Sequence, residues 1–393
     1  MKTLKVFILV ITISIQAFSQ TDLMNVKPWA YWLQDITIKT IVDDTSFELI
    51  VMDYSQDGLD DSKFTPAQID SIKNSGKYAI SYISIGEAED YRYYWDNSWE
   101  TSPPSWLGPE NPDWEGNYKV RFWETQWQDI IFAYIDTIIN QGFDGIYMDI
   151  IDGYYYWSEE NAEQAYADSL MCQFIINIRN HVNSVTGNTD FILIPQNGED
   201  VYDQENVSTS LKTAYFNAIN AIGVEDVFFP GDLDEDNSYD PDTYRISILQ
   251  EYLLKNKQIF SVEYLTDNDK ITQYKNASAI QEFVPYVCTR DLAHLCGGIT
   301  LNLPELEANF TENIILYPNP AQNYLKIYLS NYDNKNSELQ LFNSIGQIIR
   351  KYNYTVSDNN IITISLTDLK TGLYFLKFKD KDHLKTYKVI ISY

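Results

Sequence analysis

Three aspartates interrupt an apolar stretch, GFDGIYMDIIDGYYYW, at residues 142–157. Side chains of a strand alternate between its two faces, so Tyr147 and Asp149 share one face while their apolar neighbours share the other. Asp149 ends the predicted strand and Asp152 follows it. Asp144 precedes the strand, where we expect a turn or capping role. α/β barrels carry their functional groups at the carboxyl ends of their strands, so a carboxylate at that position is a candidate for chemistry.

Acids and amides recur at the ends of the other apolar runs. The ends of parallel strands meet at one rim of a barrel, so these residues predict one polar pocket. Crowded carboxylates are costly to bury, and they raise the pKa of at least one member, as a general acid requires. The residues expected to bind substrate there are Tyr31, Gln34, Asp53, Tyr82, Glu87, Arg92, Asp152, Asn197, Glu225 and Glu263.

Carboxylates together with abundant aromatic residues suggest cleavage of a glycosidic bond, in which one carboxyl protonates the leaving oxygen and another attacks or activates water. The three histidines, His181, His294 and His383, are scattered along the chain, which disfavours a Ser-His-Asp, Cys-His or zinc site. No cofactor or metal is expected. Aromatic residues near strand ends could stack on sugars or simply pack in the core: Tyr31, Trp32, Tyr82, Trp95, Tyr154, Tyr155, Tyr156 and Trp157.

Short apolar runs alternate with helical stretches between Trp29 and Leu303. Helices are predicted at 65–76, where Thr65 and Pro66 begin the helix, at 123–141 and at 158–185, with glycines after each. This alternation predicts parallel strands with helical crossovers. The eight predicted strands are 29–34, 47–53, 77–87, 143–149, 190–197, 223–229, 257–264 and 297–303.

Eight such units predict an α/β fold, a (β/α)8 TIM barrel, over residues 21–308. An open doubly wound sheet is the alternative, but neither GxGxxG nor GxxxxGK[ST] occurs. From residue 309 onward, short alternating strands separated by turn residues predict a small β-sandwich at 309–393.

The first 20 residues read as a secretory signal peptide. Lys2 and Lys5 precede an apolar core at 6–15, and small residues follow at Ala17 and Ser19. No later segment is expected to form a stable membrane span. Export permits a disulfide, for which Cys288 and Cys296 are the candidates, leaving Cys172 free.

The charge is uneven along the chain. The whole chain carries −28; residues 309–393, with 10 Lys/Arg and 7 Asp/Glu, carry +3, which leaves −31 for the rest. Such a surface repels nucleic acid and anionic lipid and suits a cationic substrate or calcium, although it also keeps an exported protein soluble. The acidic run 232–242 lacks the Gly and Glu of an EF-hand, so we expect a flexible loop there, with a calcium site as the alternative.

Several segments resemble the TM1410/MJ1477-type glycoside hydrolases, which are related to the endo-α-1,4-polygalactosaminidases of glycoside hydrolase family 114. The resemblance implies a TIM barrel that hydrolyses a galactosamine-containing polysaccharide. It also implies that Asp149 and Glu199 are catalytic. The matching segments are WLQ (32–34), ISYISIGEAEDYRYYW (80–95), GFDGIYMDIIDGY (142–154), IPQNGED (194–200) and VEDVFF (224–229).

The C-terminal region resembles the type A sorting domain of the type IX secretion system. The resemblance implies that the type IX secretion machinery is a partner and that the protein is secreted or held at the cell surface. A carbohydrate-binding β-sandwich is the alternative. The matching segments are YPNP (317–320), NSIGQII (343–349), TGLYFLKF (371–378) and KVIIS (388–392).

The leading hypothesis is an exported glycoside hydrolase that cleaves α-glycosidic bonds within an amino-sugar polysaccharide. Asp149 is the expected nucleophile and Glu199 the expected general acid/base. Glu225 is the alternative acid if Glu199 faces away from the cleft. The rival hypothesis is a non-catalytic carbohydrate-binding barrel at the cell surface. A metal-dependent polysaccharide deacetylase is a third possibility, but it needs a His/Asp ligand set.

Overall fold

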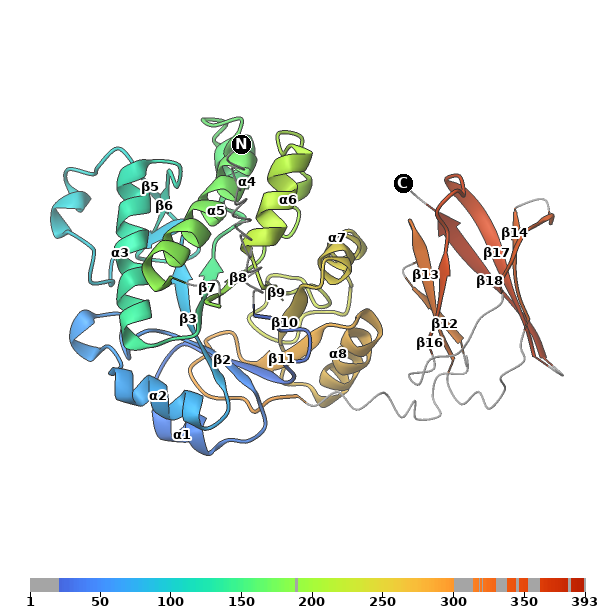
Figure 1. Cartoon of the computed structure of the whole chain (residues 1–393), viewed down its shortest axis with the longest axis horizontal. Helices are drawn as coiled ribbons and strands as arrows, with labels where there is room; N and C mark the ends of the chain where they lie inside the picture. The colour runs from blue at the N-terminus through green and yellow to red at the C-terminus, as the bar shows by residue number, and fades with distance from the viewer. Residues whose placement is uncertain are drawn as a thin grey trace, which may run out of the picture.

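The computed structural model describes residues 21–187, 190–299, 314–317, 319, 321–329, 338–343, 346–352, 361–380 and 383–391. The predicted signal peptide lies outside these residues, as does the predicted domain boundary at 308/309. Figure 1 shows an α/β region that extends through α8 and β11, and a group of antiparallel strands toward the C-terminus.

Eight parallel strands form the barrel and confirm the predicted fold class. Their order is β1-β2-β3-β7-β8 followed by β9-β10-β11, and a parallel bridge between Gln196 and Gly223 joins the two groups. Trp29 Nε1 donates to the Val284 carbonyl at 2.9 Å, which links the first strand to the last. The strands are β1 (Trp29–Trp32), β2 (Leu49–Met52), β3 (Tyr78–Ser84), β7 (Gly145–Asp149), β8 (Ile192–Pro195), β9 (Ala221–Glu225), β10 (Gln258–Tyr264) and β11 (Val284–Cys288).

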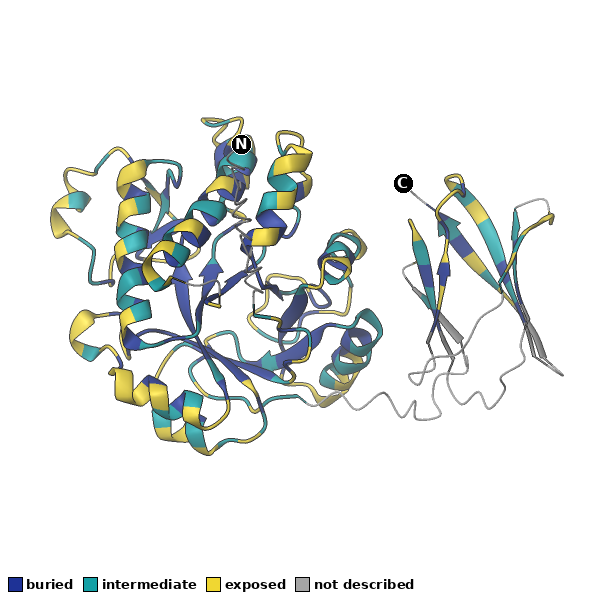
Figure 2. Cartoon of the chain, viewed as in Figure 1, coloured by how far each residue is buried: buried dark blue, intermediate teal, exposed yellow. Residues whose placement is uncertain are grey.

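Helices cover the outside of the barrel, and their outward faces are exposed while the strands are buried (Figure 2). The α-helices are α1 (Ile38–Asp43), α2 (Pro66–Asn74), α3 (Thr125–Gln141), α4 (Gly153–Tyr155), α5 (Ala167–Thr186), α6 (Thr209–Ala218), α7 (Thr243–Leu254) and α8 (Asn268–Gln281). Single turns of 3-10 or π-helix are η1 (Asp60–Ser62), η2 (Asn97–Glu100), η3 (Tyr156–Glu160) and η4 (Val201–Asp203).

Capping residues in the sequence predicted the helix ends correctly, but the predicted start of one helix is wrong. Thr65 and Gln68 form a reciprocal capping box on α2, and Gly142 ends α3 with φ of 89°. The helix predicted at 158–185 instead begins at Ala167. Residues 156–160 form a π-helical turn that buries Trp157, so the segment before Ala167 belongs to the loop after β7.

The predicted third strand, 77–87, divides into two elements. β3 ends at Ser84, and Glu87 begins a small antiparallel sheet of order β4-β6-β5. Gly86 allows the break, because a Cβ there would lie 2.1 Å from the Ile150 carbonyl oxygen. The added strands are β4 (Glu87–Glu89), β5 (Leu107–Glu110) and β6 (Asn117–Val120).

The predicted eighth strand, 297–303, is wrong. β11 takes that place and pairs in parallel with β10, from Phe260 with Val284 to Tyr264 with Cys288. Pro285 concealed this strand from sequence reasoning, because proline cannot donate to a sheet ladder. Residues 297–299 have no regular structure, and 300–303 lie outside the described residues.

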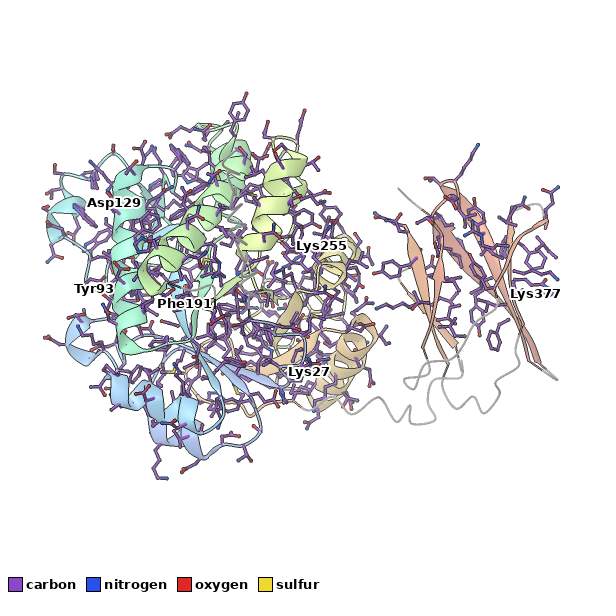
Figure 3. The ribbon with its side chains drawn as sticks, in the orientation of Figure 1. Lys27, Tyr93, Asp129, Phe191, Lys255 and Lys377 are labelled. Atoms are coloured by element: carbon purple, nitrogen blue, oxygen red, sulfur yellow. A yellow bond between two sulfur atoms is a disulfide. The ribbon has the colours of Figure 1, made fainter. Side chains whose placement is uncertain are left out.

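Aromatic side chains fill the interior of the barrel. The Trp29 ring lies 5.3 Å from that of Phe260 and 5.6 Å from that of Tyr286, measured between centroids. Side chains occupy the space between strands and helices throughout (Figure 3). Tyr147 reaches across to β9, where a Cβ on Gly223 would lie 1.9 Å from the tyrosine hydroxyl. The face that carries Tyr147 and Asp149 therefore points into the barrel, as predicted.

The C-terminal region is an all-β domain, as predicted. Its two sheets have the orders β12-β13-β16 and β15-β14-β17-β18, and they share a core of their own that includes Leu325, Leu341 and Val389. The strands are β12 (Ile314–Tyr317), β13 (Tyr324–Leu329), β14 (Glu338–Asn343), β15 (Ile348–Tyr352), β16 (Ile361–Ser365), β17 (Gly372–Asp380) and β18 (His383–Ile391).

Candidate active site

One large cleft opens at the carboxyl ends of the barrel strands. Its volume is about 1510 Å³, larger than the roughly 300–1,000 Å³ of small-molecule sites. Every site residue predicted from the sequence lines this cleft except Glu263. The convergence of acids from separate strands at one rim is therefore what the structure shows.

Asp149 lies at the centre, at the end of β7. Tyr82 donates its hydroxyl to Asp149 Oδ2 at 2.7 Å, and the Ile150 N–H donates to Oδ1 at 2.8 Å. Burial raises the pKa of Asp149 well above its usual range, and the charge of Glu225 raises it further. The two hydrogen bonds act in the opposite direction, because they stabilise the ionised carboxylate.

Glu225 ends β9 and is the neighbouring carboxylate that most affects Asp149. Asn197 Nδ2 donates to its Oε1 at 2.9 Å, and the Tyr264 hydroxyl donates to its Oε2 at 2.5 Å. Both central carboxylates thus accept hydrogen bonds from uncharged donors. The charge of Glu225 acts on Asp149, so the two carboxylates lie close together at the centre of the cleft.

Glu199 follows β8 and is differently placed. Its carboxylate is buried and forms an ion pair with Arg245, whose Nε and Nη2 both donate to it. Arg245 also donates to the Glu225 carbonyl at 3.0 Å and to Asn197 Oδ1 at 3.3 Å. This charge-assisted pair holds the Glu199 carboxylate in one geometry beside Asn197 and Glu225.

A second arginine neutralises the acids on the other side of the cleft. Arg92 is 3% exposed and donates to Asp53 at 2.6 Å and to Glu89 at 2.7 Å. Burial raises the pKa of Asp53, and Arg92 opposes that rise. The guanidinium also lies 5.9 Å from the ring of Tyr82, so this cluster supports the residue that donates to Asp149.

Two further predicted acids lie between these groups. Glu87 is buried, and its Oε1 accepts from Asn111 at 2.9 Å. Burial raises its pKa, and Lys119 opposes the rise. Asp152 is open to the cleft, and desolvation there, together with the charges of Glu225 and Glu199, raises its pKa to about 6.

Tyr31 and Gln34 extend the site along the first strand and its loop. The buried Tyr31 hydroxyl donates to Gln196 Oε1 at 3.2 Å, and the exposed Gln34 donates to the Asp291 carbonyl at 3.1 Å. Tyr31 therefore belongs to the floor of the cleft and Gln34 to its rim.

Glu263 does not line the cleft, where the sequence predicted that it would contact substrate. Its neighbour Tyr264 faces the barrel interior, so strand alternation turns Glu263 to the outside. There its carboxylate accepts from the Phe228 N–H at 2.7 Å and is fully buried. Burial raises the pKa of Glu263 to about 8.

The candidate stacking aromatics divide between core and cleft. Most are buried or packed on other rings, as for Trp95 against Trp99 at 5.2 Å. Tyr155 is 54% exposed in the cleft. Sequence reasoning did not single out the cleft residues Trp114, Tyr244, Arg245, Tyr264 and Arg290. The alternation of side chains along β10 could have identified Tyr264. The other four residues come from loops or helix ends, where no such alternation exists.

Positive backbone φ angles mark the residues that follow three of the strands. Ile150, Asn197 and Asp226 have φ of 60°, 57° and 54°. Such conformations are uncommon for residues other than glycine and cluster at functional sites. Asp226 in turn accepts from both Nη atoms of Arg290, at 2.9 and 3.0 Å.

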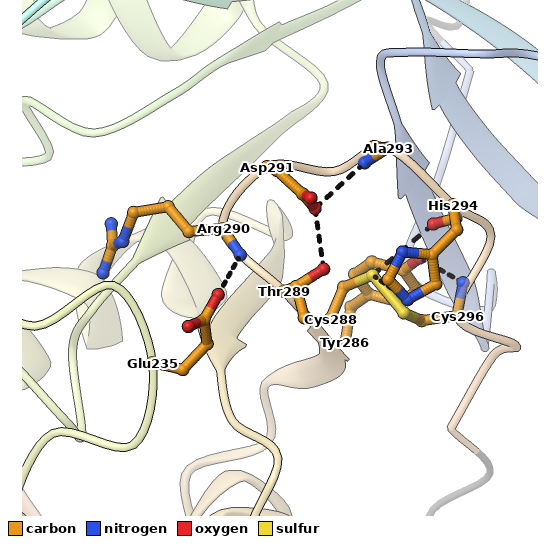
Figure 4. The surroundings of a disulfide bond; sticks show 9 residues. All are labelled: Glu235, Tyr286, Cys288, Thr289, Arg290, Asp291, Ala293, His294 and Cys296. Carbon is orange, nitrogen blue, oxygen red and sulfur yellow. Dashed lines mark hydrogen bonds between the residues drawn. A yellow bond between two sulfur atoms is a disulfide. The ribbon is translucent and has the colours of Figure 1, made fainter.

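Within the described residues, one group of three potential metal ligands occurs, formed by Cys288, His294 and Cys296. The two cysteines form a disulfide, as the sequence suggested (Figure 4). Cys172 is free and buried. A disulfide leaves no thiolate to bind a metal. The acidic loop forms no such group, and Asp236 there accepts from the Thr266 and Asp267 N–H groups.

A family model described as glycoside-hydrolase family GH114 matches residues 15–302. The chain belongs to family GH114. An uncharacterized protein of Methanocaldococcus jannaschii, MJ1477, is 40% identical to this GH114 chain over 270 residues, which cover 67% of this chain and 75% of the relative. An uncharacterized protein of Thermotoga maritima is 34% identical over 278 residues, 67% of this chain and 81% of the relative. The protein is therefore a glycoside hydrolase.

Solved structures support the barrel fold of this GH114 member. The glycoside hydrolase domain of PelA from Pseudomonas aeruginosa has a TM-score of 0.52 and 15% identity, covering 70% of this chain and 98% of that one. Aspergillus fumigatus Ega3, in complex with galactosamine, has a TM-score of 0.51 and 13% identity, covering 69% and 94%. At these identities the likeness shows the fold alone.

A second family model, described as a secretion system C-terminal sorting domain, matches residues 315–392. This confirms the predicted type IX sorting domain, so the GH114 protein is secreted or displayed at the cell surface. In the described part of the chain, no helix is long and apolar enough to cross a membrane.

Proposed function

We propose that this GH114 barrel cleaves internal α-glycosidic bonds of a galactosamine-containing polysaccharide, with Asp149 as nucleophile and Glu225 as general acid/base. Glu225 replaces Glu199 in this role. The observation that carries the assignment is that Asp149 and Glu225 lie close together at the centre of the cleft, where uncharged groups donate to both. Glu199 is already paired with Arg245.

In the proposed mechanism Glu225 acts first as the general acid, and the ionised Asp149 is the nucleophile. When a glycosidic oxygen lies beside Glu225, the proton on Glu225 passes to that oxygen as the bond to the anomeric carbon breaks. Asp149, stabilised by Tyr82 and the Ile150 N–H, attacks the anomeric carbon and forms a glycosyl ester. Glu225 then removes a proton from the water that hydrolyses the ester. The configuration at the anomeric carbon is retained.

A cationic polymer is the proposed substrate because the cleft is strongly acidic. It is lined by 16 acidic and 4 basic side chains. Such a field concentrates positively charged ligands. An α-1,4-linked galactosamine polymer that has lost part of its acetyl groups carries ammonium groups, and Ega3 was solved in complex with galactosamine.

The test is to incubate the purified full chain with galactosamine, N-acetylgalactosamine and neutral oligosaccharides and to read the products by mass. We expect internal cleavage of the galactosamine oligomers, and its loss in both Asp149→Asn and Glu225→Gln. Near-normal turnover in either variant would remove the assignment. Retention of a glycan without any cleavage would favour the carbohydrate-binding barrel instead.

A further inference from the structure

Four large aromatic side chains that line the cleft are exposed, and one of them, Tyr91, is bound to Glu89 through its hydroxyl. The other three, Trp114, Tyr155 and Tyr244, are 57%, 54% and 58% exposed. Exposed aromatic rings of this size at the edge of a cleft indicate a binding surface, since burying each ring in the core would be favourable.

None of the three rings is used by the chain itself. In the described residues, Trp114, Tyr155 and Tyr244 have no stacking partner, and the indole N–H and both hydroxyls make no hydrogen bond. The buried neighbour Tyr154 contrasts with them, because its hydroxyl donates to Asp200 at 2.7 Å. The three rings therefore remain available to a ligand.

The backbone beneath each ring is nevertheless held in place. The Asn117 N–H donates to the Trp114 carbonyl at 3.1 Å, the Tyr155 N–H donates to the Asp152 carbonyl at 2.8 Å, and the Tyr244 N–H donates to Asp242 Oδ1 at 3.0 Å. A platform on fixed backbone loses little conformational entropy when it binds.

The rings are spread around the rim of the cleft rather than gathered at one point. Trp114 lies between β5 and β6, Tyr155 in α4 after β7, and Tyr244 in the first turn of α7. In Figure 1, β5 and β6 lie on the opposite side of β7 and β8 from α7. A short ligand bound at Asp149 and Glu225 could not reach all three.

Carboxylates accompany each ring along the cleft. Glu115 follows Trp114 in the sequence, Glu160 lies one turn beyond Tyr155, and all of these residues line the cleft. Partial burial raises the pKa of the Tyr244 hydroxyl, and the charge of the nearby Asp200 raises it further. A ring beside a carboxylate matches an amino sugar, which presents an apolar ring face and an ammonium group.

We propose that Trp114, Tyr155 and Tyr244 form outer sugar subsites that hold an amino-sugar polymer on both sides of the bond being cleaved. The proposal rests on the proposed function and specifies how the same cleft selects long chains. It predicts that affinity rises with the number of sugars until the outer rings are occupied.

The test measures binding of a galactosamine dimer and of an octamer to the full chain carrying Glu225→Gln, which prevents cleavage during the measurement. Trp114→Ala, Tyr155→Ala and Tyr244→Ala should each weaken octamer binding about 3- to 10-fold and leave dimer binding unchanged. Trp114→Phe, Tyr155→Phe and Tyr244→Phe keep an aromatic ring and should restore most of the affinity.

Tyr166 supplies the matched control, since it is 60% exposed and does not line the cleft. Tyr166→Ala should change neither affinity. Equal losses for dimer and octamer, an equal loss in Tyr166→Ala, or no loss in the three alanine variants would each overturn the proposal. If the unaltered chain binds the octamer but does not cleave it, the proposed function is wrong, whereas the proposed subsites remain supported.

Discussion

The centre of the cleft and its two flanks contain the same kind of side chain in different electrostatic settings. On the flanks, Arg245 pairs with Glu199 and Arg92 pairs with Asp53 and Glu89. At the centre, Asp149 and Glu225 receive hydrogen bonds from tyrosine hydroxyls, an asparagine amide and a backbone N–H. The acids paired with arginine are buried and the two central acids are half-buried, so the flanks and the centre differ both in burial and in the charge of the donors.

The difference identifies which acids can do chemistry. An arginine fixes a carboxylate as an anion in one geometry, so such an acid positions its neighbours. A carboxyl group held only by uncharged donors can exchange a proton with a substrate as charge develops. The four predictions that follow test this contrast, from the largest expected effect to the smallest.

Asp149→Asn and Glu225→Gln should each lower kcat on a galactosamine oligomer by about 10³-fold or more, because each removes a group that makes or breaks bonds. Combining the two should cost little more than either alone, since they act as one unit. Initial rates by reducing-end assay measure the effect. A double variant whose loss equals the product of the single losses would contradict this joint action.

Arg92→Met should lower the free energy of unfolding by about 3–5 kcal/mol, because it leaves two buried carboxylates without a counter-charge. Urea unfolding followed by tryptophan fluorescence reports the barrel specifically, as all nine tryptophans lie between residues 29 and 157. The control is Arg121→Met, whose ion pair with Glu163 is partly exposed and worth about 1 kcal/mol or less. Similar losses in both variants would contradict the structural role of Arg92.

Glu263→Gln should flatten the pH dependence of stability. The folded protein keeps Glu263 neutral up to a pKa of about 8, whereas the unfolded chain ionises it above the ordinary value of 4.5. Stability is therefore lost as pH rises between these values, and glutamine removes that loss. The variant should be more stable than the parent at pH 8.5 by about 2–4 kcal/mol, with little difference at pH 4.5.

Urea unfolding at the two pH values measures the Glu263 effect. Glu205→Gln, at an exposed position, is the control and should leave the pH dependence unchanged. A Glu263→Gln variant with the same pH slope as the parent would show that Glu263 is not buried as a neutral acid.

Glu199→Gln should lower kcat by about 10-fold, well below the loss in Glu225→Gln. Glutamine keeps an oxygen for Arg245 but removes the ion pair. Arg245 is then held less firmly, and kcat falls because Asn197 and Glu225, which Arg245 contacts, change orientation. Rates measured under the same conditions for the two variants decide between them. A loss in Glu199→Gln that exceeds the loss in Glu225→Gln would restore Glu199 as the acid.

Sequence periodicity predicted the barrel because each strand of a parallel sheet is a short apolar run between amphipathic helices. It located Asp149 and Glu225, since the alternation in β7 and β9 turns them into the barrel with Tyr147 and Gly223. The same alternation would have excluded Glu263, whose neighbour Tyr264 holds the inward position. β11 was not predicted because it contains Pro285. Proline has no backbone N–H to donate to a neighbouring strand, so a segment that contains it does not look like a strand in the sequence.

The sequence by itself determined the barrel, the sorting domain and the crowding of acids at strand ends, because these depend on local patterns of apolar and polar residues. Only the tertiary structure decided which acids meet an arginine. Arg245 is 46 residues from Glu199 and Arg92 is 39 residues from Asp53, so no local pattern links them. A carboxylate's chemistry depends on the donors within a few ångströms, and folding alone selects those donors.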